Sequence, residues 1–270
     1  MEGSHYEQHH YEDPKFPVLF HLDTLSESMV FVPHWHQNLE ILYFLEGGAA
    51  ITIDTEEIAA SAGDVIVIPT NALHNVVCTT ALTSYYCLIV DWDFCGALGL
   101  PLDTLDFRRR IREPALCARL DVLAEELRGK APYCKAQALS DIISIMVYLA
   151  RHQLAPSRIS LSETQSSRLE MVKRVFLYID QHYAEPLTMD QLAGRAGFTK
   201  YYFCHIFKEI TGMTPVSYIN FIRCRKAKEF LTVKGCNVGE AAVLCGFTNL
   251  SYFTKTYKKY NGELPSSAMK

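Results

Sequence analysis

Between residues 30 and 90, short apolar runs alternate with turn residues. The runs are rich in Val, Ile and Tyr, which favour β strands, and glycine or proline separates one run from the next. Many short strands at close spacing are typical of a β-sandwich or barrel. The predicted strands include residues 41–45, 49–53, 64–69 and 85–90. We therefore predict a β-barrel domain over residues 1–105.

After Asp106 the apolar spacing changes to that of helices. Apolar positions recur at helical intervals in residues 108–129 and 135–152, which predicts a helical bridge over residues 106–154. The apolar stripe of the second helix could pack on the barrel or form a dimer interface, and a helix can do both with different faces. The candidate dimerisation residues are Leu139, Ile142, Ile143, Met146 and Leu149.

Residues 155–167 have the composition of a flexible linker, and an internal repeat follows them. Residues 187–215 align with residues 236–265, with an offset of 49 before a turn and 50 after it. We predict that residues 168–270 form one all-α domain. The matched positions are Ala193 with Ala242, Gly197 with Gly246, Phe198 with Phe247, Phe203 with Phe253, Lys208 with Lys258, and Pro215 with Pro265.

Both copies have the residues of a helix-turn-helix unit. Thr188 with Gln191, and Asn237 with Glu240, have capping-box spacing and would open a short helix. The matched glycines permit a sharp turn before a second helix. One such pattern is a weak indication, whereas two copies joined by a basic helix indicate DNA binding. The predicted fold class is two-domain α and β: a barrel with a helical bridge, then an all-α double helix-turn-helix.

The charge distribution agrees with this division. Residues 168–270 contain 15 Lys and Arg against 8 Asp and Glu, a net charge of +7. From the totals of 26 and 30, residues 1–167 then hold 11 against 22, a net charge of -11. A basic part beside an acidic part indicates that the basic part meets a polyanion.

The remaining composition is that of an ordinary globular protein, with 49% hydrophobic and 21% charged residues. The nine cysteines lack C-x-x-C spacing, which indicates reduced thiols in a cytoplasmic protein. No apolar run approaches the roughly 20 residues of a membrane span, so we expect no membrane partner. We expect His5, His9 and His10 to belong to a solvated tail.

The segment HWHQNLE, residues 34–40, carries candidate chemistry. Side chains alternate along a strand, so His34, His36 and Glu40 would point the same way if one continuous strand carries them. His74 follows the next strand segments. Imidazole and carboxylate groups that converge in a barrel could hold a divalent transition metal. The same histidines could instead hydrogen-bond an organic ligand or one another, and the pattern leaves both interpretations open.

These residues resemble the cupin superfamily over residues 30–80. The first cupin motif, H-x-H-x3-E-x6-G, matches His34, His36, Glu40 and Gly47. The second motif matches Gly63, Pro69 and His74, but Asn71 stands where a glycine is often found. The resemblance implies a sensor or catalytic barrel with an effector or metal site at His34, His36, Glu40 and His74.

The C-terminal repeat resembles the DNA-binding domain of the AraC-type transcription regulators over about 100 residues. The segments FKEITGMTPVSYI and GFTNLSYFTKTYKKYNG carry the resemblance. An N-terminal cupin barrel is a familiar partner of this domain. The resemblance implies a homodimer that binds double-stranded DNA and a small-molecule effector, and that contacts RNA polymerase if it is an activator.

By position, the resemblance implies that the second helix of each copy enters the major groove. Asn249 could bond an adenine edge and Leu250 could meet a thymine methyl, whereas Lys208, Arg223, Lys258 and Lys259 would contact phosphates or stay solvated. The candidate DNA-binding residues are Lys200, Tyr201, Cys204, His205, Lys208, Asn249, Leu250, Ser251, Thr254, Lys255 and Lys258. The family commonly has isoleucine at Ala241 and a Tyr-Arg pair near the end, so we expect looser packing of the second copy.

The leading hypothesis is a sequence-specific transcription regulator controlled by a small ligand in the barrel, such as a sugar-related or other metabolite. The alternative is a metal-dependent cupin enzyme, an isomerase or oxygenase, with an appended nucleic-acid module; Tyr43 and Asp54 are its candidate acid–base groups. A third hypothesis is a barrel that binds no ligand and serves dimerisation alone.

Overall fold

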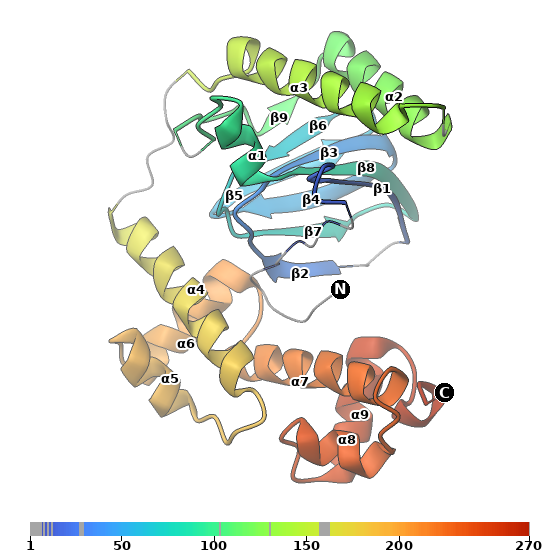
Figure 1. Ribbon diagram of the computed structural model, residues 1–270. Coiled ribbons are helices and arrows are strands. Elements are labelled where there is room, and N and C mark those ends of the chain that lie inside the picture. Colours follow the sequence, from blue (N-terminus) through green and yellow to red (C-terminus); the bar gives the residue numbers. More distant parts are fainter. Residues whose placement is uncertain are drawn as a thin grey trace. The chain divides into compact units, whose positions relative to one another are not determined.

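The computed structural model describes residues 7, 9, 11, 13–26, 30–102, 104–129, 131–156 and 163–269 (Figure 1). They belong to two compact units, one within Gln8–Ser160 and one formed mainly by Leu161–Lys270. No helix within these described ranges is both long and apolar enough to cross a membrane. Each unit has its own hydrophobic core.

The first unit contains two antiparallel sheets, as the short apolar runs predicted. The five-stranded sheet has the order β1 (Val18–Ser26), β8 (Leu82–Val90), β3 (Leu39–Glu46), β6 (Val65–Ile68) and β9 (Arg110–Ile111). The four-stranded sheet has the order β2 (Val30–His34), β7 (His74–Cys78), β4 (Gly48–Ile53) and β5 (Glu56–Ser61). The prediction of a β-barrel of the cupin type is therefore confirmed.

Strand β3 is buried on both faces, which explains its continuous apolar sequence ILYFL. Leu42 and Phe44 point into the core between the two sheets, where both are inaccessible to solvent. Ile41 and Tyr43 point the opposite way and belong to a second core beneath the helices. Glu40 has the same parity as Leu42, so it faces the interior of the barrel.

Helices α2 (Pro114–Gly129) and α3 (Cys134–His152) cover the outer face of the five-stranded sheet, and the short α1 (Trp92–Ala97) follows β8 (Figure 1). Ile142, Met146 and Leu149 of α3 are buried in this second core. Leu139 packs against the same core, and Ile143 is half-buried. The stripe therefore packs on the barrel, and a role of these residues in dimerisation stays a prediction.

The second unit is all-α, which confirms the predicted fold class. Its first helix, α4, begins inside the segment 155–167 that we expected to be a linker; residues 157–162 of that segment lie outside the described residues. Two helix-turn-helix units, α5–α6 and α8–α9, flank the long helix α7. The bounds are α4 (Glu163–His182), α5 (Met189–Ala196), α6 (Lys200–Thr211), α7 (Pro215–Thr232), α8 (Val238–Leu244), α9 (Leu250–Asn261) and a final 3-10 turn η1 (Pro265–Ser267).

Local sequence explains where these helices begin. Both predicted capping boxes are present, at Thr188 with Gln191 and at Asn237 with Glu240. In each box, the side chain of the N-cap residue accepts the backbone N–H of the residue three positions later. The side chain of that residue accepts the backbone N–H of the N-cap. Ala241 is fully buried in the core of the second helix-turn-helix unit. That core is therefore closed at this position, although the side chain is smaller than the isoleucine common in the family.

The aromatic residues of the repeat fill the two helix-turn-helix cores. In the first helix-turn-helix unit, the ring of Phe207 of α6 contacts those of Phe176 of α4 and Tyr218 of α7. The ring centroids lie 5.3 Å and 5.6 Å away. In the second helix-turn-helix unit, Phe253 and Tyr257 of α9 match Phe203 and Phe207, and their ring centroids lie 5.6 Å apart. These aromatic side chains are inaccessible to solvent or nearly so, so α6 and α9 are each held by their own core.

Candidate effector site and DNA-binding surface

Four side chains from two sheets converge inside the barrel. His34 ends β2, His36 precedes β3, Glu40 lies on β3, and His74 begins β7. Their potential ligand atoms all lie within 4.8 Å of one another. His36, Glu40 and His74 are buried, and His34 is half-buried. The structure thus brings together the four residues that the sequence singled out.

Backbone carbonyls orient the three imidazole rings. The Nδ1 atom of His34 lies 3.0 Å from the carbonyl oxygen of Val32, and that of His36 lies 3.1 Å from the oxygen of Asn38. The Nδ1 atom of His74 lies 2.9 Å from the Ala72 oxygen. A carbonyl can only accept, so each Nδ1 carries the proton and donates it. In a neutral ring, Nε2 then keeps its lone pair.

Two of these Nε2 atoms meet one carboxylate oxygen. The Nε2 atoms of His36 and His74 each lie 3.0 Å from Oε2 of Glu40. Burial alone would raise the pKa of Glu40, but the imidazoles of His74 and His36 outweigh it and hold that pKa well below its usual range. Burial lowers the pKa of His36, although Glu40 opposes the shift. The carboxylate of Glu40 is therefore ionised and lies against two imidazole nitrogens.

This donor set fits a divalent transition metal. Such ions take neutral imidazole nitrogen and carboxylate oxygen at about 2.1 Å, and metal-ligating histidines usually donate their other N–H to a carbonyl or carboxylate. The four side chains supply such ligand atoms, and the three histidines each donate their other N–H to a carbonyl. The fit rests on side chains that already share one small volume.

Three neighbours of the cluster were missed by the sequence reasoning. Cys87 of β8 donates its thiol to Oε1 of Glu40 at 3.3 Å. The side-chain amide of Asn38 lies 2.8 Å from Nδ1 of His9, and the rings of His9 and His36 are 4.7 Å apart. The expectation of a solvated tail is therefore wrong for His9, whereas His5 and His10 lie outside the described residues. A contact across 29 positions has no local sequence signal.

The two candidate acid–base groups of the enzyme alternative do not join the cluster. Tyr43 lies on the face of β3 opposite to Glu40 and packs beneath α2 and α3. Asp54 occupies the turn between β4 and β5, where its carboxylate accepts the N–H of Leu73 at 3.0 Å. Their positions are explained by packing and turn formation.

The first recognition helix, α6, presents four of the candidate DNA-binding residues in different surroundings. Tyr201 is 85% exposed, and Cys204 is half-buried. Nζ of Lys200 lies 3.0 Å from Asp190 of α5, and Nε2 of His205 lies 3.8 Å from Glu209. Tyr201 is thus the large accessible side chain of this face.

The second recognition helix, α9, is more basic. Leu250 and Ser251 are exposed at its first turn, and no described carboxylate forms an ion pair with Lys255. Thr254 donates its hydroxyl to the Leu250 carbonyl at 3.0 Å. Asn249 is the N-cap, and its Oδ1 accepts the N–H of Tyr252 at 2.8 Å. That oxygen is therefore committed, and a two-point contact with adenine would need the cap to open.

The four candidate phosphate contacts divide into two kinds. Lys208, Lys258 and Lys259 are exposed on the recognition helices. Arg223 of α7 is half-buried, and its guanidinium donates to two backbone carbonyls of the loop after α4. Two of its nitrogen donors, Nε and Nη2, are therefore used within the protein, and contact of Arg223 with phosphate stays a prediction.

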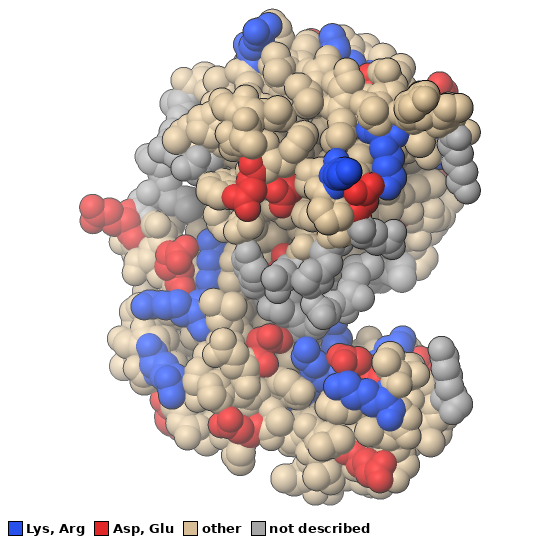
Figure 2. Space-filling view, in the orientation of Figure 1, with Lys and Arg blue, Asp and Glu red and all other residues tan. Residues whose placement is uncertain are grey.

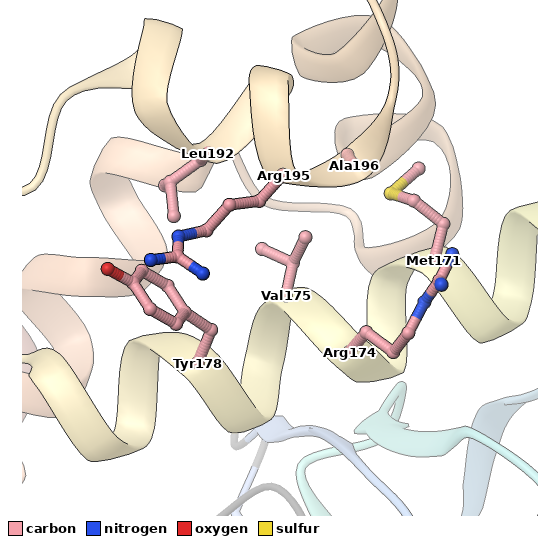
Figure 3. Close-up of a pocket in the computed structure, with 7 residues that line it drawn as sticks. All are labelled: Met171, Arg174, Val175, Tyr178, Leu192, Arg195 and Ala196. Atoms are coloured by element: carbon pink, nitrogen blue, oxygen red, sulfur yellow. The ribbon is translucent and has the colours of Figure 1, made fainter.

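The first helix-turn-helix unit is held to α4 by a cation–π contact. The guanidinium carbon of Arg195 of α5 lies 4.0 Å from the ring centroid of Tyr178 of α4. Both side chains line a cavity of about 220 Å³, and Figure 3 shows them with Leu192 and Val175 beside them. The contact fixes α5 against α4 next to buried apolar side chains.

Charge is mixed on the face of the molecule in Figure 2. Lys and Arg of the second unit are interspersed there with Asp and Glu. Ion pairs such as that of Lys200 with Asp190 account for part of the mixing. The net charge of +7 in residues 168–270 is therefore not gathered on this one face.

Comparisons with known proteins agree with the two-part geometry. A family model described as a helix-turn-helix domain matches residues 192–270, and one described as a cupin domain matches residues 23–89. The uncharacterized HTH-type transcriptional regulator YdiP of Escherichia coli K12 is 23% identical over 248 residues, which are 86% of this chain and 79% of YdiP.

Two further relatives have higher identity over shorter stretches of this chain. The transposon Tn10 TetD protein of Escherichia coli is 32% identical over 110 residues, 40% of this chain and 80% of TetD. The HTH-type transcriptional activator RhaS of Pectobacterium carotovorum is 28% identical over 148 residues, 55% of this chain and 51% of RhaS.

A cupin barrel followed by two helix-turn-helix units defines a DNA-binding transcription regulator. The two domain models, the relatives and the doubled motif also identify the family. This chain belongs to the AraC-type transcription regulators.

Proposed function

We propose that this regulator is controlled by a ligand in its barrel, and that a divalent transition metal held by His34, His36, Glu40 and His74 is part of that ligand. The observation that carries the proposal is the orientation of the rings. Three Nδ1–H groups donate to carbonyls, so the Nε2 atoms face one carboxylate. Such a set suits ions that prefer imidazole and carboxylate.

The bound ion would supply a Lewis-acid position for an oxygen atom of an organic effector. A sugar-related or other oxygen-rich metabolite suits that role. We infer that the site serves sensing rather than catalysis, since the relatives are transcription regulators and Tyr43 and Asp54 serve packing and a turn. The effector must favour one state of the chain over another in order to change DNA binding.

Metal content of the purified full-length chain tests the proposal. After exposure to a mixture of divalent ions and dialysis, mass spectrometry should find about one ion per chain. His36→Ala should lose it, whereas His21→Ala should retain it, since His21 lies outside the cluster beside Asp23. Wild-type chain without a bound ion, stabilised instead by an organic compound in the presence of chelator, would contradict the role of the metal.

We also propose that α6 and α9 contact double-stranded DNA through the candidate residues on their exposed faces. Support comes from the exposure of Tyr201 on α6 and of Leu250 and Lys255 on α9. The base contacts would come from the start of each helix and the phosphate contacts from its lysines. If the regulator is an activator, RNA polymerase is its further partner.

For the homodimer we propose the outer face of α2 and α3. Val122 is 56% exposed there, beside Ala115, Ala118 and Ser144 in a shallow cavity of about 390 Å³. Small and apolar side chains let two such faces approach closely. Val122→Glu should yield monomers in sedimentation velocity, with a control at exposed Val233→Glu; dimers in both variants would contradict this interface.

A further inference from the structure

We propose that the loop after α4, residues 183–185, fixes the distance and rotation between the two recognition helices, with Arg223 as the positioning residue. One chain would then accept a single spacing between the two DNA segments that α6 and α9 contact. The inference rests on the proposed use of both helices in DNA binding.

Arg223 joins α7 to this loop at two points. Its Nε donates to the carbonyl oxygen of Tyr183 at 2.7 Å, and its Nη2 donates to that of Glu185 at 2.8 Å. The guanidinium carbon also lies 5.7 Å from the ring centroid of Phe247, at the turn of the second unit. Arginine can make such a forked contact because its donors are fixed in one plane, whereas lysine has a single nitrogen.

Gly246 brings the turn of the second unit against the same loop. A Cβ atom at this position would lie 2.4 Å from the carbonyl oxygen of Ala184, which is shorter than any real contact. Gly197, the matched residue of the first unit, has nearly the same φ, +76° against +77°, yet nothing lies within 4 Å of its Cβ position. The close approach is therefore a property of the second unit and not of the turn itself.

The loop also contributes a side chain to the second unit. Tyr183 packs against the core formed by Cys224, Cys245 and neighbouring residues of α7–α9. At its other end the loop continues from α4, which belongs to the first unit through the contacts of Phe176 with Phe207 and of Tyr178 with Arg195 (Figure 3). Helix α4 and its loop thus touch both units.

These contacts give the two units a second connection beside α7. A single connecting helix can bend or twist, but two connections close a ring of contacts that resists both motions. The separation and relative rotation of α6 and α9 are then set by the fold before DNA is met. One additional base pair moves a DNA segment by about 3.4 Å and rotates it by about 35°, which such a pair of helices could not follow.

The test uses the full-length chain and a duplex that the wild-type chain selects from a random pool. Affinities are measured for the selected duplex, for versions with one base pair inserted or removed between the two contacted segments, and for duplexes that keep one segment. The variants are Arg223→Lys and, as a reciprocal control on the same helix, Lys228→Arg. Lys228 lies 3.5 Å from Glu263, a contact that arginine can also make.

Wild type and Lys228→Arg should lose about tenfold or more in affinity on a one-base-pair change, and Arg223→Lys less than about threefold. All three should bind the single-segment duplexes equally. Equal losses in wild type and Arg223→Lys would overturn the inference. Weaker binding of Arg223→Lys to a single segment would also overturn it, because Arg223 would then maintain one unit and not the spacing. A wild-type chain that selects no two-part sequence would instead overturn the proposed use of both helices.

Discussion

His34 and His74 face each other across the β2–β7 pair, with their ring centroids 4.1 Å apart. Each ring donates to a carbonyl two residues earlier in its own strand segment. The pairing of two antiparallel strands therefore sets the relative position of two donors, and Glu40 on β3 lies within reach of both.

The first prediction concerns stability. A divalent ion at about 100 times its dissociation constant should add about 2.7 kcal/mol to the free energy of unfolding. Thermal unfolding with and without chelator measures this gain. His74→Ala should lose it because one of the four donors is removed, and His21→Ala should keep it. A gain that persists in His74→Ala would show that the ion binds elsewhere.

The second prediction concerns phosphate contact. Lys255→Ala should weaken binding to specific and nonspecific duplexes alike, and should reduce the slope of log affinity against log salt by about 0.9. Lys234→Ala is the control, since Lys234 lies beyond α7 and pairs with Glu229 at 3.6 Å. An unchanged slope in Lys255→Ala would remove this residue from the contacts.

The third prediction concerns base recognition by α6. Tyr201 is 85% exposed, so its ring has few contacts to lose in the free protein. Tyr201→Ala should cost about 1–3 kcal/mol of binding free energy on the selected duplex and relax the preference at one or two base pairs. Tyr133 belongs to the barrel unit and is 87% exposed, so Tyr133→Ala should change neither the binding free energy nor the base-pair preference. Parallel losses on all duplexes would indicate a backbone contact.

The fourth prediction compares two tyrosine hydroxyls of the second helix-turn-helix unit. The hydroxyl of Tyr257 is buried without a hydrogen-bond partner among the described residues, whereas that of Tyr260 donates to the Ser217 carbonyl at 2.9 Å. Tyr257→Phe should leave stability unchanged or raise it, and Tyr260→Phe should cost about 0.5–1.5 kcal/mol. Denaturant unfolding measures both; a larger loss in Tyr257→Phe would mean that its hydroxyl is satisfied.

The fifth prediction compares two glycines with left-handed backbone. Gly262 has φ of +76° and nothing within 4 Å of a Cβ, whereas Gly246 has φ of +77° and the close approach to Ala184. Gly262→Ala should cost about 1–2 kcal/mol from backbone conformation alone. Gly246→Ala should cost clearly more, because Ala184 must also move. Equal losses in thermal unfolding would argue against a tight contact in solution.

Local and periodic features were predictable from sequence. Motif spacing identified His34, His36 and Glu40, but they converge from β2, a turn and β3 and not along one continuous strand, as alternation had supposed. Capping spacing placed the start of α5 at Thr188. Contacts with partners distant in the chain were not predictable. The apolar stripe of α3 was compatible with two interfaces, since periodicity defines a face but not its partner. Arg223 was assigned to phosphate or solvent because backbone carbonyls, its actual partners, leave no trace in a sequence.

Strand β3 carries Glu40 on one face and, on the other, the side chains Ile41 and Tyr43 that support α2 and α3. Selection for a different effector and selection for a different strength of subunit pairing would then act on the same eight residues of backbone. Effector specificity and dimer strength would then evolve together. A homologue that binds another effector through substitutions in this strand would also have altered subunit association, and compensating substitutions should appear on α2 or α3.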